Sequence, residues 1–569
     1  MCYYLQSMIM RSTIRMFLSF SLIVLISTAI PNLFAAPTIN GVANAASNVA
    51  FNSPVAPGGI FVIYGTDLGP PNLVISPTPF QNTTLSDTSV TVTVGSTTVN
   101  ALMYYTSATQ VAALLPSSTP IPTQTSGAPI FTVTFNGQTS APANHGIAQS
   151  NLGIFTIDSS GQGPGIVTFA DYSLVSAGKT PSCGGPYTAC GSANPGDTLI
   201  LWGTGLGPVS GDDASGAGLG QNMPNVPLTL WLGGTKANIL YQGRSGCCIG
   251  EDQIVFTVPD NVPTGCAVPL VVQIGTNTNT ISNTTVMAIA SGSRNCTPTN
   301  PAVGSVNVEQ AVMAGSVSYG FFELDRFLNN NGPGFQDSAR FEFGKSLGYK
   351  TGSEPFFVSY LDNPPLGTCI VYGNLNGPSD PPFTDVAPVD GGSSFTIKGP
   401  NGTMAVQGGG TKVTLSAAGT FLVPGAYTIT GTGGADVGAF TANFTIPQSP
   451  TLLSPTAAAN LAFTRSNGLT VTWNGNGSTG NVDIFMLSAL DNMFSFGSVA
   501  NCRVAASAGS FTIPPYVLLA LPVGNFTQFE LSPGIISPAV SASFTARGIN
   551  LGLVEAFIDG TAFGGFALR

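Results

Sequence analysis

The acid–base side chains of this chain are few, and they limit the chemistry it can perform. A hydrolytic triad needs a base beside its nucleophile, yet the 569 residues contain a single histidine, His145. His145 stands between Asn144 and Gly146, in a segment typical of an interdomain loop. We therefore expect a solvent-exposed loop residue here and no triad.

Two pairs of carboxylates are the candidates for glycoside hydrolysis, which uses two acids that flank the scissile bond. They are Glu323 with Asp325 and Glu342 with Glu354. Ordinary ion pairing is the stronger expectation for these acids, because three basic residues lie close to them in the sequence: Arg326, Arg340 and Lys345. We expect no catalysis, and an enzyme within residues 303–446 stays as the alternative.

A glycine-rich stretch, Gly408–Lys412, invites comparison with a phosphate-binding loop. That loop needs the order Gly-Lys-Ser/Thr between a strand and a helix. Here Thr411 precedes Lys412 and another strand-like run follows, so the stretch predicts a hairpin turn.

Calcium is the one cofactor with some support, since acidic residues at loop ends supply the oxygen ligands that Ca²⁺ prefers. The candidate ligands are Asp212, Asp213, Asp380 and Asp385. The spacing of an EF-hand is absent. We expect no cofactor, with calcium left open.

The N-terminus has the layout of a secretory signal peptide. Arg11 and Arg15 form a basic flank, residues 16–30 form an apolar run, and Ala35 or Ala36 ends a small-residue cleavage site. We therefore assign residues 1–36 to a leader and expect an extracellular or cell-surface protein. A retained signal anchor is the alternative, and no later apolar run predicts a second membrane span.

Cysteine usage agrees with export, because an even number of cysteines in an exported chain is typical of disulfides. Eight cysteines follow the leader: Cys183, Cys190, Cys247, Cys248, Cys266, Cys296, Cys369 and Cys502. The first two are spaced to close a local loop, and the next four fall in one predicted domain and could form two bridges. The last two lie in different predicted domains, so their pairing stays open.

Composition excludes several classes of partner. Only 7% of the residues are charged and the net charge is −10, so no basic cluster exists to neutralise the phosphates of a nucleic acid. The 43% of hydrophobic residues exclude a disordered chain, because disorder needs low hydrophobicity and high charge. Short alternating runs of Thr, Val and Ser between turns predict an all-β protein of sandwich domains.

One stretch of strand and turn occurs twice. Ala56–Pro70 and Asn194–Pro208 are offset by 138 residues (194 − 56) and share seven of fifteen positions. The turn that ends each copy contains the motif positions Gly65, Thr66, Leu68 and Gly69, repeated as Gly203, Thr204, Leu206 and Gly207.

Three further runs follow each copy in the same order, which indicates two tandem copies of one sandwich. The matched pairs are 90–95 with 228–234, 102–104 with 239–241, and 110–116 with 253–259.

This pattern resembles the TIG/IPT group of immunoglobulin-like domains, and more closely the uncharacterised C-terminal domain family of secreted Solibacter-type bacterial proteins. The resemblance covers residues 38–296, and the family carries no established activity. The segments that carry it are Gly153–Thr156, Pro195–Asp197, Gly203–Pro208 and Gln253–Pro259.

The remaining half predicts two more sandwiches joined by a proline-rich linker at residues 447–455. Gly468–Trp473 resembles a strand of fibronectin-III-like domains. The predicted division is 37–150, 151–296, 303–446 and 456–569.

These features favour a non-enzymatic, secreted or cell-surface protein of tandem immunoglobulin-like sandwiches with an adhesion, structural or protein-interaction role. The alternative is a carbohydrate-binding protein accessory to polysaccharide degradation. The aromatic residues that could stack on sugars lie inside apolar strands, where core packing is the stronger expectation: Tyr104, Tyr105, Trp231 and Trp473.

Overall fold

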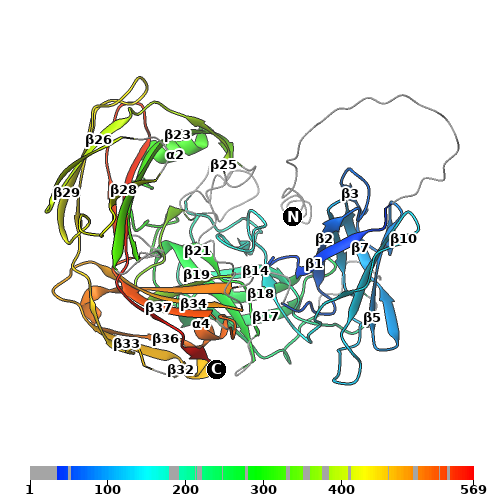
Figure 1. Ribbon diagram of the computed structural model, residues 1–569. Coiled ribbons are helices and arrows are strands. Elements are labelled where there is room, and N and C mark those ends of the chain that lie inside the picture. Colours follow the sequence, from blue (N-terminus) through cyan, green and yellow to red (C-terminus); the bar gives the residue numbers. More distant parts are fainter. Residues whose placement is uncertain are drawn as a thin grey trace.

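The structure is a computed structural model of the 569-residue chain. It describes residues 35–48, 53–178, 191–211, 213, 221–246, 248–275, 280–304, 306–328, 334–349, 359, 361–373, 383–407, 412–458, 461–490, 497–524, 526–534 and 539–569. Nearly all described elements are strands, arranged in separate sheets that pack in pairs (Figure 1). The predicted fold class, tandem β-sandwiches, is confirmed.

The first sandwich packs a five-stranded sheet, in the order β1-β2-β8-β7-β3, against a sheet of β10-β9-β5-β4 that β6 and β11 extend. The strands are β1 (Thr38–Asn44), β2 (Ile60–Thr66), β3 (Val74–Ile75), β4 (Thr84–Leu85), β5 (Thr88–Val94), β6 (Thr97–Asn100), β7 (Leu102–Thr106), β8 (Gln110–Leu114), β9 (Ile130–Phe135), β10 (Gln138–Thr139) and β11 (Ala143–Asn144).

The second sandwich repeats this plan with the orders β12-β14-β18-β17 and β16-β15-β19-β20, to which β13 and β21 are added. The strands are β12 (Gly153–Ile154), β13 (Val167–Phe169), β14 (Thr198–Thr204), β15 (Leu228–Leu232), β16 (Thr235–Lys236), β17 (Asn238–Arg244), β18 (Asp252–Thr257), β19 (Gly265–Ile274), β20 (Thr280–Ile281) and β21 (Thr285–Ile289). The four matched runs of the sequence coincide with β2/β14, β5/β15, β7/β17 and β8/β18.

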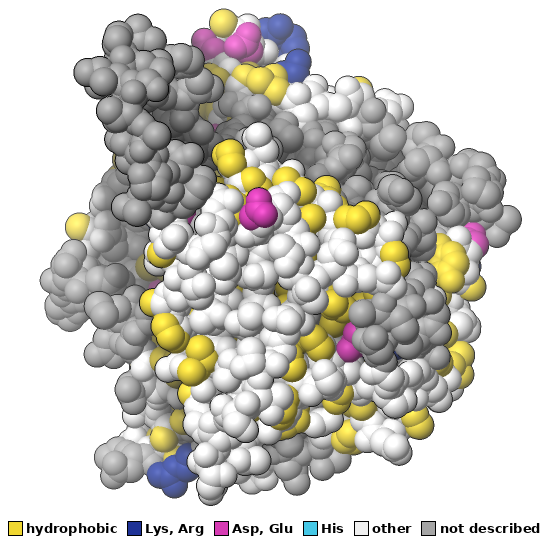
Figure 2. Space-filling model, turned by 90° about the vertical axis from the view of Figure 1, so that its right-hand side faces the viewer, with side chains coloured by type: hydrophobic (Ala, Val, Ile, Leu, Met, Phe, Trp, Pro, Cys, Tyr) yellow, Lys and Arg dark blue, Asp and Glu magenta, His cyan; other side chains and the backbone are white. Residues whose placement is uncertain are grey.

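Alternation along the strands explains their burial. In β5 the valines face the core, and Thr91 and Thr93 lie half-buried on the other face, as a period of two requires. The hydroxyls on that face bond in pairs across strands, for example Thr91 with Thr132 at 2.6 Å. Figure 2 shows one face of the molecule, on which charged side chains are sparse.

The C-terminal half forms a third and a fourth sandwich. The third packs a sheet of β25-β23-β22-β39-β38 and β28 against β27-β26-β29-β30, around a core rich in phenylalanine. Its strands are β22 (Ser318–Leu328), β23 (Phe335–Tyr349), β25 (Phe383–Pro388), β26 (Ser394–Gly399), β27 (Gly402–Gln407), β28 (Val413–Ser416), β29 (Gly425–Gly431), β30 (Phe440–Ile446), β38 (Val540–Ser543) and β39 (Leu551–Ile558).

The fourth sandwich packs β24-β35-β34-β37-β40 against β31-β33-β36 and the pair β32-β41. Its elements are β24 (Thr368–Tyr372), β31 (Thr451–Ser454), β32 (Ala462–Phe463), η4 (Arg465–Asn467), β33 (Leu469–Asn474), β34 (Asn481–Ala489), β35 (Gly497–Ala505), η5 (Ala506–Ala508), β36 (Ser510–Ile513), α4 (Pro515–Leu519), β37 (Phe526–Ser532), β40 (Thr561–Gly564) and β41 (Ala567–Leu568). Helix α2 (Val306–Met313) precedes β22.

This strand pairing differs from the division at residues 303–446 and 456–569 that the sequence predicts. β22 pairs in parallel with β39 along eight residue pairs, from Tyr319↔Leu551 to Arg326↔Ile558. β24 pairs with β35, and the Cys369–Cys502 disulfide joins them. Both segments therefore contribute strands to both sandwiches, because local alternation specifies a strand but not its partner.

The structure also differs from the predicted linker, and some other predicted segments are outside the described residues. The predicted linker contains strand β31, an edge strand beside β33. The strand predicted at residues 356–360, except Ser359, and most of the leader lie outside the described residues. Among the described residues, no helix is both long enough and apolar enough to span a membrane.

Candidate functional site

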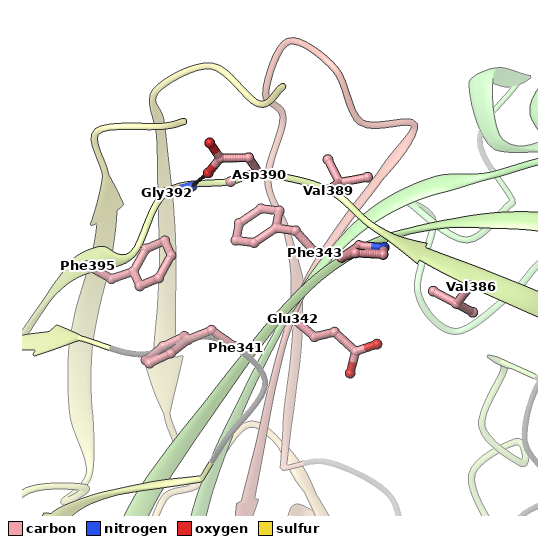
Figure 3. A pocket seen from close by; sticks show the side chains of 10 residues that line it. Phe341, Glu342, Phe343, Val386, Val389, Asp390, Gly392 and Phe395 are labelled. Atoms are coloured by element: carbon pink, nitrogen blue, oxygen red, sulfur yellow. Dashed lines mark hydrogen bonds between the residues drawn. The ribbon is translucent and has the colours of Figure 1, made fainter. Parts of the chain in front are cut away.

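A cavity of about 570 Å³ opens at one end of the third sandwich (Figure 3). Three phenylalanines line one side of it, and two carboxylates are the charged groups of its lining. Its size is within the range of roughly 300–1,000 Å³ that small-molecule sites occupy. The cavity is therefore the candidate binding site in the described part of the chain.

The cavity forms where the chain passes from one sheet of the third sandwich to the other. β25 pairs with β23 up to Pro388, and the next residue, Val389, still donates its N–H to the carbonyl of Phe343 at 3.2 Å. The backbone then crosses over the Phe343 ring at Gly391, where a Cβ atom would lie 2.4 Å from the ring. Only glycine allows this close approach, so Gly391 shapes the cavity wall.

The aromatic wall is a continuous cluster. Phe341 and Phe395 come from opposite sheets, are 1% exposed, and place their ring centroids 4.9 Å apart. Phe343 stacks on Phe395 at 6.0 Å and remains half-buried. Because Phe341 and Phe395 belong to the core, Phe343 is the ring that both packs and remains accessible.

The two carboxylates lie on different sides of the Phe343 ring (Figure 3). Glu342 accepts a hydrogen bond from the Tyr319 hydroxyl and one from Arg340 Nη2, each at 2.7 Å. Burial, followed by the bond to Glu342, raises the pKa of Tyr319. The Tyr319 hydroxyl thus remains a hydrogen-bond donor at neutral pH.

Asp390 is the second acid. Its carboxylate accepts hydrogen bonds from the backbone N–H groups of Ala435 and Gly392, at 3.1 and 2.9 Å. These bonds lower the pKa of this exposed group, so the carboxylate stays ionised in mild acid. The cavity thus combines an apolar wall with anionic acceptors.

Of the described carboxylates considered for hydrolysis, Glu342 lines the cavity, whereas Glu323 and Asp325 are not part of its lining. Glu323 and Asp325 share one face of β22, and Asp325 pairs with Lys412 at 2.6 Å. Burial, then the neighbouring Asp325, raises the pKa of Glu323. Glu342 pairs with Arg340 as the sequence suggested, and Glu354 lies outside the described residues.

The prediction for His145 was wrong. The side chain is 7% exposed and packs edge-to-face on Phe131, with centroids 5.8 Å apart. The polar neighbours Asn144 and Gly146 suggested a loop, but the next apolar residue, Ile147, is also buried and brings this segment onto the first core.

The predicted sugar-stacking aromatics serve mainly as core. Tyr104, Tyr105 and Trp473 are 4%, 6% and 3% exposed. Trp231 is half-buried and stacks on Tyr516 of helix α4 at 4.6 Å, which joins the second sandwich to the fourth. Sequence reasoning missed Phe343, although Phe341 and Phe343 alternate with charged residues as a strand pattern would.

Of the predicted disulfide cysteines, Cys266 and Cys296 are bonded to each other. Cys248 is in a disulfide, and its partner is outside the described residues. The described residues also leave out Cys183, Cys190 and Cys247. Two described bridges therefore brace the second and fourth sandwiches.

The calcium candidates do not form a described site. Asp213 instead accepts bonds from Ser117 N and from Ser117 Oγ, the latter at 2.9 Å, and so joins the first two sandwiches. Asp212 and Asp380 lie outside the described residues, and only the backbone of Asp385 is described. No group of three His, Cys, Asp or Glu side chains among the described residues is arranged to hold a metal ion.

The second copy of the repeated motif lies at the junction of the first two sandwiches, which we call the seam. Its apolar part joins residues such as Ile60 and Tyr104 of the first sandwich to Trp202 and Ile249 of the second. Its polar part centres on Arg244 and Asp252, both 1% exposed and paired at 2.6 Å.

Around this ion pair the second copy of the motif is held by side chains. Asp252 also accepts bonds from the N–H groups of Gly205 and Leu206, each at 2.7 Å, and Arg244 donates to the Gly207 carbonyl at 3.0 Å. Burial raises the pKa of Asp252 to about 6, while Arg244 and the two amides oppose this shift.

Comparison with known proteins gives no family assignment. No family model matches the chain, and no curated protein matches it. Among solved structures, the plexin A4 extracellular region is 13% identical with a TM-score of 0.16, and covers 42% of this chain and 17% of its own length. SGBP-B of Bacteroides ovatus, in complex with a mixed-linkage heptasaccharide, is 11% identical with a TM-score of 0.14, and covers 85% of this chain and 96% of its own.

Such low TM-scores leave function to be argued from the chain itself. The chain spans less than a fifth of the plexin region's length.

Proposed function

We propose that the chain is an exported, non-enzymatic binding protein of TIG/IPT-like sandwiches with an adhesion or protein-interaction role. The observation that carries the proposal is the seam. Hydrogen bonds across the junction, such as the one from Ile60 N–H to Thr204 Oγ1 at 2.8 Å, and a shared apolar core hold the first two sandwiches in one orientation. Rigid presentation lowers the entropy lost on binding, which suits a protein whose loops and edges meet a partner.

Export is supported by the leader-like N-terminus and by the Cys266–Cys296 and Cys369–Cys502 disulfides, which persist in oxidising compartments. The acidic balance of the chain, with a net charge of −10, disfavours nucleic acid and anionic membrane surfaces as partners.

Carbohydrate binding is the second candidate, and the cavity of the third sandwich favours it. A half-exposed aromatic ring with carboxylate acceptors beside it, as Phe343 has in Glu342 and Asp390, suits a sugar ring whose apolar face stacks while its hydroxyls donate.

The experiment that separates the two is a binding panel with the oxidised full-length exported protein. It is offered cell-wall and plant polysaccharides, with calcium and with a chelator, and in parallel an array of extracellular proteins. Saturable binding to a protein with none to the glycans supports adhesion. Saturable binding to one glycan class supports the second candidate, and chelator sensitivity would indicate a loop carboxylate site. Turnover of a glycan that is lost in Glu323→Gln would overturn both.

A further inference from the structure

The cavity at Phe343 has a charge pattern that selects its ligand. Of the ten residues that line it, Glu342 and Asp390 carry charge, and both are acids. Arg340 is the base nearest to Glu342 and is already bonded to it at 2.7 Å. The uncompensated charge at the cavity is therefore negative.

Asp390 is the stronger of the two acceptors. Its oxygens accept bonds only from neutral backbone N–H groups in the described structure, and its own N–H donates to Asp436 Oδ2 at 2.9 Å. These three bonds fix the carboxylate at the cavity mouth, where each oxygen retains a free lone pair.

The apolar wall adds a second constraint. The half-buried Phe343 offers its ring to the cavity in front of the buried Phe341 and Phe395, and Val386 and Val389 also line the cavity. A ring face attracts a cation as well as an apolar body, at about 0.5–2 kcal/mol per contact. An anion would meet both acids without compensation.

We propose that this cavity binds an organic cation, namely an ammonium group carried on an apolar or aromatic body. The inference rests on the proposed binding function and names the ligand chemistry of one site. The apolar body packs against the accessible part of Phe343, and the ammonium group lies toward Asp390. Neutral sugars lack the positive charge that would form an ion pair with Asp390, and Glu342 and Asp390 repel carboxylate ligands.

Three probes of nearly equal shape test the proposal on the full-length protein by calorimetry at neutral pH. They are 2-phenylethylamine, which is a cation, 2-phenylethanol, which is neutral, and 3-phenylpropionate, which is an anion. We expect the amine to bind at least about tenfold more tightly than the alcohol and the acid not to bind. Equal binding of amine and alcohol, or binding of the acid, would overturn the assignment.

Variants locate the site. Asp390→Asn should lower the affinity for the amine about tenfold and leave the alcohol unchanged, while Phe343→Leu should weaken both. The matched control is Asp67→Asn, because Asp67 is an exposed acid in the first sandwich. Unchanged amine binding in Asp390→Asn, in a variant whose thermal melting matches that of the parent protein, sinks the assignment.

The same variants keep this proposal separate from the proposed function. If Asp390→Asn and Phe343→Leu bind the partner from the panel normally and the amine fails to bind the parent protein, the cavity assignment fails and the binding function stands. If the amine binds as expected but the panel yields no partner, the cavity assignment stands and the proposed adhesion or protein-interaction function fails.

Discussion

The two copies of the repeated turn, Gly65–Pro70 and Gly203–Pro208, have nearly the same sequence and different surroundings. Thr66 in the first copy is exposed, whereas Thr204 in the second is 0% exposed and lies in the seam. The first turn therefore belongs to one sandwich, and the second turn joins two.

What the copies share is explained by packing within each sandwich. A Cβ atom at Gly65 would lie 1.9 Å from the carbonyl of Thr38, and one at Gly203 would lie 2.4 Å from that of Gly153. In each copy the motif glycine thus allows the first strand of its sheet to approach.

What the copies do not share is how the turn is held. In the first copy, Leu68 N–H donates to the carbonyl of Ala108 at 3.0 Å. In the second, Leu206 N–H donates to the Asp252 carboxylate. Thr109, the position that aligns with Asp252, is exposed. The two turns therefore share their packing within a sandwich and differ in the groups that accept hydrogen bonds from their backbone.

The largest effect is expected from breaking the ion pair of the second copy. Asp252→Asn leaves Arg244 buried without its carboxylate, which should lower the free energy of unfolding by about 3–5 kcal/mol. The matched change in the first copy, Asp67→Asn, should alter it by less than about 0.5 kcal/mol, because Asp67 is exposed and Asn also tolerates its positive φ of 55°. Denaturant unfolding of both variants measures the difference. Similar losses of unfolding free energy in the two variants would show that the buried ion pair stabilises the fold no more than an exposed turn residue does.

Leucine truncation should, in contrast, affect the two copies alike. Leu68 and Leu206 are both 0% exposed, each in the core of its own sandwich. Replacement of either by Ala should lower the free energy of unfolding by about 2–5 kcal/mol. A large effect in one copy alone, measured by the same unfolding curves, would mean that the copies do not share one packing plan.

The sequence predicted this shared plan well. Gly, Leu and the alternating runs are local signals, and the strands they predict in the first two sandwiches coincide with β2, β5, β7 and β8 and their partners. The seam was not predictable in this way. Arg244 and Asp252 lie eight residues apart in the sequence, and neither indicates that Gly58 of the other sandwich lies against the guanidinium.

The C-terminal half shows the same limit more strongly. β22 and β39 begin at residues 318 and 551, and no local pattern pairs strands so far apart. The cavity depends on this long-range arrangement, because Phe343 and Phe395 come from different sheets. The sequence shows Phe343 and Phe395, but it does not show that the two rings pack together.

The pH dependence of the seam offers a third test. Glu251 is 1% exposed and neither of its carboxylate oxygens has a hydrogen-bond partner in the described structure. Burial, with the nearby Asp252 charge, raises the pKa of Glu251 from 4.5 to about 8. The aligned residue of the first copy, Ala108, cannot ionise.

Because the folded pKa lies above the unfolded one, the contribution of Glu251 to stability is fully present below about pH 4.5 and is lost as the pH rises to about 8. Over this interval the folding equilibrium constant should fall by up to about tenfold per pH unit from this group. Asp252 is the charged group that acts on Glu251, and its own pKa, raised to about 6, makes it act on stability in the same direction. Glu251→Gln should flatten the profile measured by urea unfolding between pH 5 and 8, and Asp67→Asn should not. An unchanged slope in Glu251→Gln would place the ionisation elsewhere.

The smallest contrast concerns the threonine that the two copies share. The hydroxyl oxygen of Thr204 accepts a bond from Ile60 N–H at 2.8 Å and donates to the Gly250 carbonyl at 2.6 Å, so one side chain satisfies a backbone group of each sandwich. Thr204→Val keeps the shape but leaves both groups buried and unpaired, which should cost about 1–3 kcal/mol. Thr66→Val removes an exposed hydroxyl and should cost less than about 0.5 kcal/mol. If amide exchange at Ile60 is faster in Thr204→Val and unchanged in Thr66→Val, the same residue type acts as a joint in one copy and as surface in the other. Equal exchange in both variants would contradict that distinction.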